Sequence, residues 1–409
     1  MAGRGLWGKR LAAAACCLAL WPGITMGAPS AGAVPTARSP LEQPNPAWKT
    51  PPPPGLSAGA AILLDWRTGQ VLWSRNADQR RDPASTTKIL TAVIAVERGK
   101  LSDPVKISAR AASTVGSSMY VRQGEIYSLH DLLHGLLLRS GNDAAVAIAE
   151  HIAGSVEAFA GLMNEKAKAV GATHSHFANP HGLTDPQHYT TARDLALITR
   201  YAVQNPTVAG VVALKEQPLT FEFLHRDVVL YNTNRLLRTL EGADGVKTGT
   251  TAAAGACLIA SATRDEQKLV AVVLNAGNRW RDAQGLLEWG FKSFQLVELA
   301  HQGETLLSVP VKSGKDIAVP VALSRDLTVV TPRQPGPGPQ LEVETAPEVP
   351  APVQQGQRLG RVRVKEGGLV VAEGDLMAVR DVAEATWVDL VYRRMRPLLR
   401  WMSMEHFFS

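Results

Sequence analysis

This sequence has few cysteines, and its net charge is small outside its two ends. Its 409 residues include three cysteines, and two of them, Cys16 and Cys17, lie in one apolar run near the N-terminus. The formal net charge is +6, of which residues 1–28 carry +3 and residues 393–409 carry another +3. The long central part is therefore neutral. This distribution argues against nucleic acid as a partner, because a nucleic-acid-binding domain concentrates its positive charge on the folded body.

The apolar run Leu11–Leu20 is too short to favour a membrane span, which needs about 20 apolar residues. Basic residues precede the run, and small residues follow it at Gly27 and Ala28. This layout predicts a secretory signal peptide over residues 1–28, cleaved near Ala28 or, alternatively, Ala33. An uncleaved membrane anchor is the other interpretation. Cleavage would leave Cys257 as the single thiol, which excludes an intramolecular disulfide.

Proline is abundant directly after the predicted signal peptide. Nine prolines fall between Pro29 and Pro54, with almost no apolar periodicity between them. Such a composition is typical of an extended, solvated segment. We therefore expect residues 29–56 to form a disordered tether between the cleavage site and the first folded domain.

The C-terminal residues 383–409 have an amphipathic pattern. Apolar side chains recur at close to helical spacing, and arginines occupy much of the remaining surface. We expect a helix that Pro397 kinks or divides. A Trp- and Phe-bearing face combined with arginine suits a helix lying on an anionic membrane surface, whereas four arginines disfavour a spanning helix. The alternative is a terminal helix packed on its own domain.

The central part alternates between strand and helix patterns. Ala60–Asp65 and Gln70–Arg75 predict a β-hairpin, and Ala253–Ala262 and Lys268–Leu274 predict adjacent strands. Helical patterns lie between and after these strands: Ser85–Arg98, Ser128–Leu138, Asp143–Ala153, a helix opened by Thr191 and Asp194 that runs to Val203, and Arg281–Phe294. Strands at both ends of a mainly helical stretch predict an α+β fold whose sheet joins the two extremities of the domain.

Beyond Leu296 the pattern changes to short Val-rich runs separated by proline and glycine. These runs are Leu306–Val311, Ile317–Val321, Leu341–Val343 and Arg361–Val364. They predict a separate small β domain over residues 297–382, with Pro332–Pro339 as an exposed loop.

Three short motifs follow one another in the α+β part. Ser85-Thr86-Thr87-Lys88 opens a helix, Ser140-Gly141-Asn142 lies in a break between helices, and Lys247-Thr248-Gly249 begins a strand region. Each motif is common by chance, but the order, spacing and element types of the three together are not. On a helix, Lys88 can reach the Ser85 hydroxyl one turn away, and burial beside Lys247 would lower the lysine pKa enough for it to act as a base. The set predicts an acyl-transfer site with a serine nucleophile.

These motifs resemble those of the penicillin-binding proteins and serine β-lactamases, and most closely the low-molecular-weight D-alanyl-D-alanine carboxypeptidases. Further matching stretches are Asp82-Pro83-Ala84, Leu132–Ala145, Asn179–Leu183, His188–Leu195, Asp244-Gly245-Val246, Arg279-Trp280 and Trp289-Gly290-Phe291. The resemblance covers residues 57–296 strongly and the remainder loosely. It implies a β-lactamase/transpeptidase-like catalytic domain over 57–296, in which helices cover both faces of an antiparallel sheet and form a helical subdomain. A β-sandwich domain at 297–382 and a membrane-associating helix at 383–409 would follow.

The resemblance also implies an activity, namely removal of the terminal D-alanine from peptidoglycan stem peptides in the cell-wall space, at the outer face of the cytoplasmic membrane. Ser85 would attack the carbonyl of the penultimate residue, and Lys88 would accept the serine proton. Ser140 would relay a proton to the leaving amine, Asn142 would orient substrate and Lys88, and Lys247 would set the local potential. β-Lactams would acylate Ser85 in place of the substrate.

The resemblance also implies a set of residues that would bind the substrate. Thr248 and Arg279 would hold the terminal carboxylate, and Arg281 is a nearby alternative to Arg279. The backbone N–H groups of Ser85 and Thr250 would form the oxyanion hole, with Gly249 between the two threonines on the same strand. The resemblance implies no cofactor.

Several alternatives remain open on the sequence alone. A serine β-lactamase or a D,D-endopeptidase would share the motifs, although the β-lactamase needs a Glu-bearing loop, and Glu157 and Glu165 fall in a helical pattern. A cell-wall-binding relative without turnover would be expected to have lost a catalytic residue. His130 and His134 have the spacing of a zinc helix, but Asp131 stands where a catalytic Glu is needed, so we predict no metal site.

Overall fold

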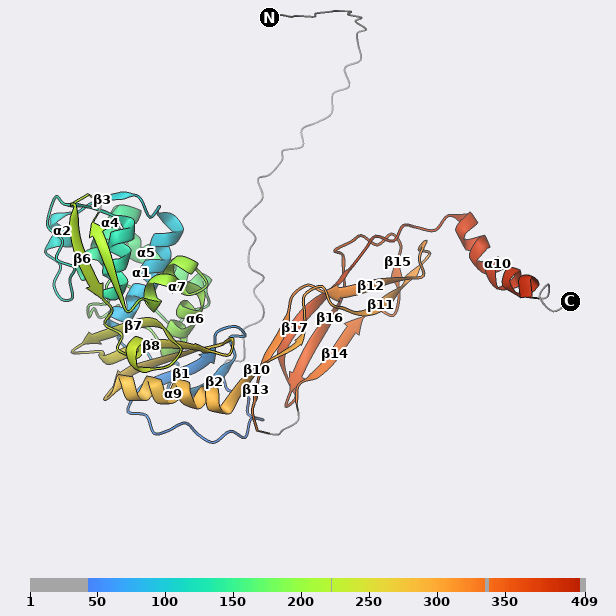
Figure 1. Cartoon of the computed structure of the whole chain (residues 1–409), viewed down its shortest axis with the longest axis horizontal. Helices are drawn as coiled ribbons and strands as arrows, with labels where there is room; N and C mark the ends of the chain where they lie inside the picture. Colours follow the sequence, from blue (N-terminus) through green and yellow to red (C-terminus); the bar gives the residue numbers. More distant parts are fainter. Residues whose placement is uncertain (1–42, 222, 335–337, 405–409) are drawn as a thin grey trace, which may run out of the picture. The chain divides into compact units, whose positions relative to one another are not determined.

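The computed structural model describes residues 43–221, 223–334 and 338–404. The predicted signal peptide, residues 29–42 of the predicted tether and residues 405–409 lie outside the described residues. Within the described residues, an α+β region is followed by an all-β region and a terminal helix, as the sequence predicts (Figure 1).

The α+β region is built on a five-stranded antiparallel sheet with the strand order β2-β1-β9-β8-β7. The strands are β1 (Ala60–Asp65), β2 (Val71–Arg75), β7 (Ala243–Thr251), β8 (Gly255–Arg264) and β9 (Gln267–Ala276). Strand β1 pairs along its whole length with β9, about 200 residues later, with Ile62 opposite Val272. This pairing confirms a sheet that joins the two ends of the domain, and it leaves β7 as an edge strand.

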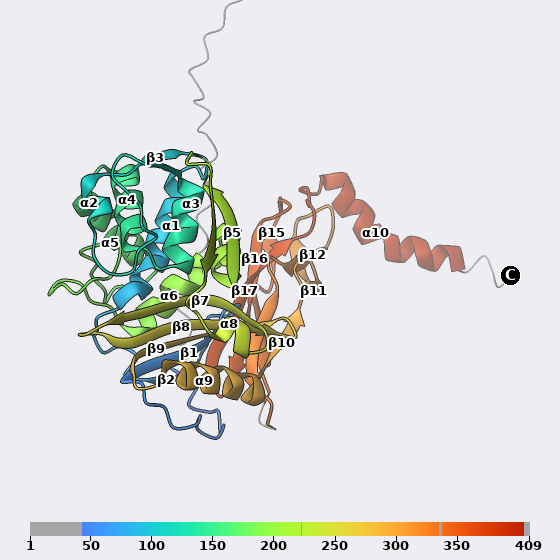
Figure 2. The ribbon, with the colours of Figure 1, turned by 60° about the vertical axis from the view of Figure 1, so that its left-hand side comes forward.

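Helices cover both faces of this sheet, which explains why every residue of β1 is buried. On one face lies α9 (Arg279–Ser293), packed against Ala61 and Leu63 (Figure 2). Ile62 and Leu64 point into the other core, with α1 (Lys88–Arg98) and α6 (Ala192–Ala202). Other helices complete that core: α2 (Ala109–Ala112), α3 (Leu129–Leu138), α4 (Asn142–Ala153), α5 (Val156–Ala169) and α7 (Pro206–Ala213). The short helix α8 (Leu236–Thr239) instead contributes Leu236 to the core beneath α9.

Side-chain caps fix where several of these helices begin. The Ser128 hydroxyl and the Asp131 carboxylate form a reciprocal capping box at α3. The Thr191 hydroxyl accepts from the Asp194 N–H at α6, which confirms the predicted start of that helix.

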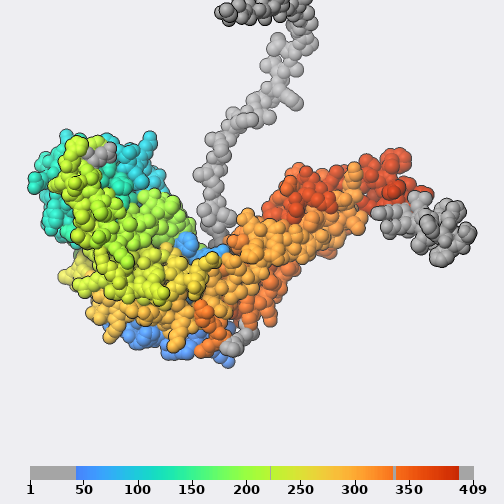
Figure 3. All heavy atoms as spheres, in the orientation of Figure 1, coloured from blue at the N-terminus to red at the C-terminus, as the bar shows by residue number. Residues whose placement is uncertain are grey.

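Two short antiparallel ribbons were not predicted. One pairs β3 (Pro104–Lys106) with β4 (Ile126–Ser128), and the other pairs β5 (Glu216–Phe221) with β6 (Arg226–Tyr231). The second ribbon, yellow-green in Figure 3, lies on the surface of the α+β region and contacts α3. Its residues are mostly exposed, so no buried apolar alternation marks it in the sequence.

The all-β region has a single apolar core. Strands β10 (Phe294–Ala300) and β13 (Leu327–Pro332) form a ribbon, and six strands form a sheet in the order β14-β16-β17-β12-β11-β15. The six are β11 (Thr305–Lys312), β12 (Ala318–Leu323), β14 (Gln340–Thr345), β15 (Val349–Pro350), β16 (Arg358–Glu366) and β17 (Leu369–Ala378). The predicted loop Pro332–Pro339 joins β13 to β14, and residues 335–337 within it lie outside the described residues.

The tether prediction needs correction for residues 43–56. This stretch contains no helix or strand, but it is packed against the rest of the chain. The Trp48 ring lies 5.0 Å from the Phe294 ring, and its Nε1 donates to Glu366 Oε2 at 2.9 Å. Asn45 is 2% exposed and donates to the Glu366 carbonyl. The contacts of the half-buried Trp48 ring and of the buried Asn45 side chain thus hold this segment despite its proline-rich composition.

The C-terminal helix α10 spans Trp387–Met404, so Pro397 does not divide it, and the kink that was the other part of this expectation stays a prediction. Proline removes one helical hydrogen bond, which a helix can tolerate by bending. Apolar side chains in its described first half are exposed, among them Trp387 at 76% and Tyr392 at 63%. This half is attached to the β domain by Arg393, which donates to the Gly314 and Lys315 carbonyls.

No helix in the described ranges is by itself long and apolar enough to cross a membrane. Helices α4 and α5 meet the length and composition criteria only as a pair, with an angle of 84° between them.

Candidate active site

Ser85 and Lys88 meet at the start of α1. Ser85 lies in the 3₁₀ turn η1 (Ala84–Thr87) and is half-buried, whereas Lys88 has no exposed surface. Lys88 Nζ donates to Ser85 Oγ at 2.9 Å. The Thr86 and Thr87 hydroxyls hold the turn by donating to the Pro83 and Ala84 carbonyls at 2.6 and 2.8 Å. The expected contact between the two residues one turn apart is therefore formed.

Lys88 is held by two further acceptors. Its Nζ donates to Asn142 Oδ1 and to the His181 carbonyl, each at 2.7 Å. Burial, reinforced by the positive charge of Lys247, lowers the pKa of Lys88 well below its usual value, although the Asp143 carboxylate opposes this shift. A lowered pKa increases the fraction of Lys88 that is neutral at a given pH, and the neutral amine is the form that can accept the Ser85 proton.

The second motif lies where α3 ends and α4 begins. Asn142 is the first residue of α4, and its Nδ2 donates to the Val115 carbonyl at 2.7 Å, which fixes its Oδ1 toward Lys88. Ser140 is 5% exposed and has a backbone φ of +62°. Among the described residues its buried Oγ has no hydrogen-bond partner. A buried, unpaired hydroxyl is unfavourable by about 1–3 kcal/mol and is thus ready to bind a substrate group.

The third motif lies on the edge strand β7. Lys247 is 1% exposed, and its Nζ donates to the Thr248 carbonyl at 3.0 Å. Burial and the nearby Arg279 lower the pKa of Lys247 to about 7. A Cβ at Gly249 would lie only 3.0 Å from the Ser85 nitrogen. Glycine at this position therefore lets β7 approach the nucleophile turn closely.

Arg279, rather than Arg281, reaches the third motif. As the first residue of α9, Arg279 donates through Nη1 to the Gly249 carbonyl and to Thr250 Oγ1, both at 2.8 Å. Arg281 instead pairs with Asp282 at 3.3 Å and its side chain is 63% exposed. Of the two arginines, Arg279 is thus the one placed beside the third motif, and its role as the carboxylate-binding residue stays a prediction.

Some contacts at the site had not been predicted. The His181 carbonyl binds Lys88 as described above, and the Thr233 hydroxyl lies 2.7 Å from the Thr248 hydroxyl. The segment Asn179–Leu183 is held near α1 because the Thr91 hydroxyl donates to the Pro180 carbonyl at 2.6 Å. Backbone carbonyls and single threonines leave no pattern in a sequence, so only the match of Asn179–Leu183 to the family could have indicated this part of the site.

The rings of His188 and His134 form hydrogen bonds within the protein, which is a structural role. His188 Nε2 lies 2.9 Å from Thr87 Oγ1, and its Nδ1 accepts from the Ala178 N–H at 3.0 Å. Burial lowers the pKa of His188 to about 4 and that of His181 to about 3, so both are neutral at pH 7. On α3, the His134 ring bonds to the His130 carbonyl at 2.9 Å, so that side chain is used within the helix.

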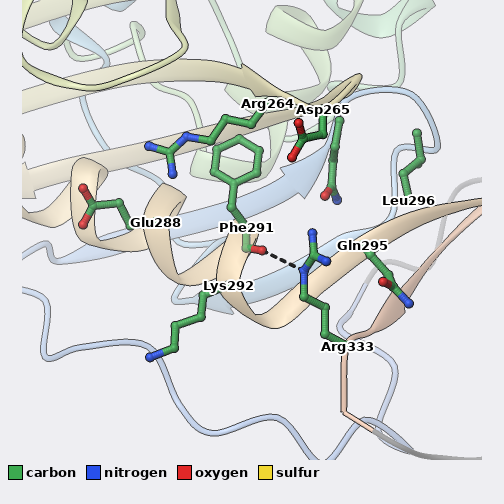
Figure 4. A pocket seen from close by; sticks show the side chains of 9 residues that line it. Arg264, Asp265, Glu288, Phe291, Lys292, Gln295, Leu296 and Arg333 are labelled. Atoms are coloured by element: carbon green, nitrogen blue, oxygen red, sulfur yellow. Dashed lines mark hydrogen bonds between the residues drawn. The ribbon is translucent and has the colours of Figure 1, made fainter.

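A cavity of about 510 Å³ lies elsewhere, beside the C-terminal end of α9 (Figure 4). Arg333 there caps the helix, because its Nε donates to the Phe291 and Phe294 carbonyls at 3.0 Å. The Arg264 guanidinium lies 4.8 Å from the Phe291 ring. No residue of the three motifs lines this cavity.

Comparison with known proteins agrees with this geometry. A family model described as D-alanyl-D-alanine carboxypeptidase matches residues 47–278, and one described as penicillin-binding protein 5, C-terminal domain, matches residues 294–384. The chain is 35% identical to the D-alanyl-D-alanine carboxypeptidase DacF of Bacillus subtilis, covering 83% of this chain and 89% of the relative. It is also 35% identical to DacC of Escherichia coli, covering 83% and 88%.

A solved structure shares the fold over both regions. Penicillin-binding protein 5 from Haemophilus influenzae superposes with a TM-score of 0.72 at 31% identity, covering 82% of this chain and all of that one. Both the α+β region and the all-β region of this chain thus have counterparts in known penicillin-binding proteins. This chain belongs to the family of D-alanyl-D-alanine carboxypeptidases, the serine peptidases of the penicillin-binding protein group.

Proposed function

We propose that this protein removes the terminal D-alanine from peptidoglycan stem peptides through an acyl-enzyme on Ser85, and that β-lactams acylate the same residue. The observation that carries the proposal is the 2.9 Å hydrogen bond between the half-buried Ser85 hydroxyl and the fully buried amine of Lys88. This is the arrangement that nucleophilic catalysis requires, because a serine hydroxyl is a weak nucleophile until an adjacent base takes its proton.

In the first half of the reaction, neutral Lys88 takes the proton of Ser85 while Ser85 Oγ attacks the carbonyl carbon of the penultimate D-alanine. The developing oxyanion accepts from the backbone N–H groups of Ser85 and Thr250. The bond to the terminal D-alanine then breaks. Ser140 relays the proton held by Lys88 to the leaving amine, which returns Lys88 to its neutral form, and this role suits the buried and unpaired Ser140 hydroxyl. In the second half, a water activated by Lys88 hydrolyses the ester and restores Ser85.

Recognition of a chain end requires a group that binds a free carboxylate. Arg279 carries a positive charge beside the third motif, and the Thr248 hydroxyl lies on the same strand. The Thr233 hydroxyl, 2.7 Å from that of Thr248, orients it. A guanidinium and a hydroxyl together favour a terminal carboxylate over an internal peptide bond.

The β-lactamase alternative lacks a suitably placed glutamate. Glu157 in α5 pairs with Arg110 at 2.8 Å with its side chain 70% exposed, and Glu165 is exposed on the same helix. The rates of two reactions distinguish the alternatives. We expect D-alanine release from a synthetic pentapeptide ending in D-Ala-D-Ala to be fast relative to penicillin hydrolysis, and the opposite ranking would favour a β-lactamase.

The endopeptidase alternative is tested with natural substrates. Muropeptides digested by the wild-type protein should lose one D-alanine each and keep their cross-links. Cleavage of the cross-links, detected by mass spectrometry of the products, would instead identify a D,D-endopeptidase.

We also propose that the protein is exported and held at an anionic membrane surface by α10. The exposed apolar side chains of Trp387, Val391 and Met395, at 76%, 50% and 48%, support this proposal over a helix packed on its own domain. Arginines on the same helix would contact anionic headgroups.

A further inference from the structure

The turn of residues 179–183 is held together by the side chain of its first residue. Asn179 is half-buried and makes three hydrogen bonds within the turn. Its Oδ1 accepts from the Gly182 N–H at 2.7 Å and from the His181 N–H at 3.3 Å, and its Nδ2 donates to the Leu183 carbonyl at 3.0 Å. Both ends of one amide group are thus used to keep the turn in one conformation.

This turn directs the backbone carbonyl of His181 at Lys88. The His181 carbonyl accepts from Lys88 Nζ at 2.7 Å. The preceding carbonyl, that of Pro180, instead accepts from the Thr91 hydroxyl at 2.6 Å. Because Lys88 and Thr91 are three residues apart on α1, both bonds attach the turn to the same face of that helix.

Lys88 has three hydrogen-bond partners among the described residues, but a neutral lysine amine has only two hydrogens. Asn142 Oδ1 and the His181 carbonyl, each 2.7 Å from Nζ, can only accept, whereas the Ser85 hydroxyl, at 2.9 Å, can also donate. The neutral amine therefore donates to the two acceptors and turns its electron pair toward the hydroxyl. This is the orientation in which Lys88 can take the Ser85 proton.

We propose that Asn179 is a positioning residue for the acylation of Ser85. By closing its turn, it keeps the His181 carbonyl on Lys88 and thereby directs the electron pair of the neutral amine at the serine hydroxyl. This inference rests on the proposed function. Within the described residues Asn179 forms no hydrogen bond with Ser85 or Lys88, so its effect passes through the backbone of His181.

The test compares Asn179→Ala with Asn205→Ala in the full chain. Asn205 is a matched control, because its Oδ1 also accepts from the N–H groups two and three residues later, at 2.9 and 3.3 Å, and a proline also follows it. Its bonds cap α7 and include no residue of the three motifs. Each protein is mixed with a fluorescent penicillin over a range of pH, and the acylation rate constant and the final labelled fraction are recorded separately. A variant that is merely less stable loses labelled fraction, whereas a misdirected Lys88 lowers the rate constant.

In Asn179→Ala we expect the rate constant on the high-pH plateau to fall about tenfold, because the base is no longer aligned with its proton donor. The His181 carbonyl also stabilises the charged form of Lys88 by accepting from it. Its loss should lower the pKa of Lys88 and move the acid limb of the profile to lower pH. Asn205→Ala should keep the rate constant and the acid limb of the wild type.

Asn179→Asp keeps an acceptor oxygen for both N–H groups and should restore the plateau rate constant to within about threefold of the wild type. A wild-type rate constant in Asn179→Ala, an unmoved acid limb, or an equal loss in Asn179→Asp and Asn179→Ala would overturn the positioning role. If the wild type neither takes up penicillin nor releases D-alanine from a peptide ending in D-Ala-D-Ala, the proposed function itself is wrong.

Discussion

Two lysines with almost no exposed surface lie at the centre of the candidate site. Burial penalises their charged forms, and each lies near another cation, Lys247 beside Lys88 and Arg279 beside Lys247. Both effects lower the lysine pKa values. A protein seldom buries two like charges side by side for stability alone, so this arrangement is best explained by the chemistry of the neighbouring Ser85.

The first prediction concerns the dependence of acylation on pH. The positive charge of Lys247 lowers the pKa of Lys88, so Lys247→Gln should raise it. A higher pKa leaves less neutral Lys88 at a given pH. The acid limb of the rate of acylation by a fluorescent penicillin should therefore move to higher pH, with a slower rate at pH 7. Lys292→Gln, at the cavity beside α9, should leave the profile unchanged. An unmoved acid limb in Lys247→Gln would show that Lys247 does not act through Lys88.

At the scale of residues, side chains with distinctive chemistry could be predicted and common ones could not. Ser85, Lys88, Asn142 and Lys247 stand in motifs whose residue types the reaction requires, and the structure brings all four together. The contributions of the His181 carbonyl, the Thr233 hydroxyl and the Val115 carbonyl depend on which backbone segments the fold brings near Lys88 and Thr248. That information is not contained in any local pattern.

At the scale of elements, the nucleophile turn η1 is enclosed by two close backbone contacts. Gly249 of β7 approaches it from one direction and Gly182 approaches it from another. A Cβ on Gly182 would lie 1.9 Å from the Ala84 carbonyl oxygen, and the residue has a φ of +86°. These two glycines set how closely the segments around Ser85 can pack.

The second prediction uses a matched pair of glycines. Gly124 has the same φ of +86° as Gly182, but no atom lies within 4 Å of the position of its Cβ. Gly124→Ala should cost only the backbone strain, about 1–2 kcal/mol of unfolding free energy, and leave penicillin acylation unchanged. Gly182→Ala should cost more and slow acylation at least about tenfold, because the Ala84–Ser85 backbone must move. Equal effects of the two substitutions on acylation would contradict this explanation.

Elements with strong apolar periodicity were predicted from the sequence, and weakly patterned ones were not. The β1–β2 hairpin and the helices α1, α3, α4, α6 and α9 all match predicted segments. The β5–β6 ribbon was missed because its strands are mostly exposed and include Pro218, which argues against a strand. The proline-rich composition of residues 43–56 predicts disorder, whereas contacts of single residues such as Trp48 with Phe294 and Asn45 with Glu366 hold the segment in place.

At the scale of the whole molecule, the positive charge at the C-terminus belongs to α10 and not to the catalytic region. Its described first half is attached to the β domain by Arg393 but keeps an exposed apolar surface. A helix of this composition needs a second surface to cover it, and an anionic membrane matches both its apolar and its basic groups.

The third prediction tests this membrane contact. The chain without residues 385–409 should no longer sediment with vesicles of anionic phospholipid, while the full chain should bind these vesicles and bind zwitterionic ones weakly. D-alanine release from a soluble peptide should be the same for both chains, because no residue of the three motifs lies in the deleted segment. Unchanged sedimentation after the deletion would mean that α10 is a helix packed within the protein.

The most direct test of the central claim, that Ser85 is the nucleophile, is to locate the acyl group. Wild-type protein and Ser85→Ala are incubated with a fluorescent penicillin and digested, and the labelled peptide is identified by mass spectrometry. We predict one penicillin per wild-type molecule, on the peptide that contains Ser85, and none on Ser85→Ala. A label that persists in Ser85→Ala, or that maps to another residue in the wild type, would contradict the account.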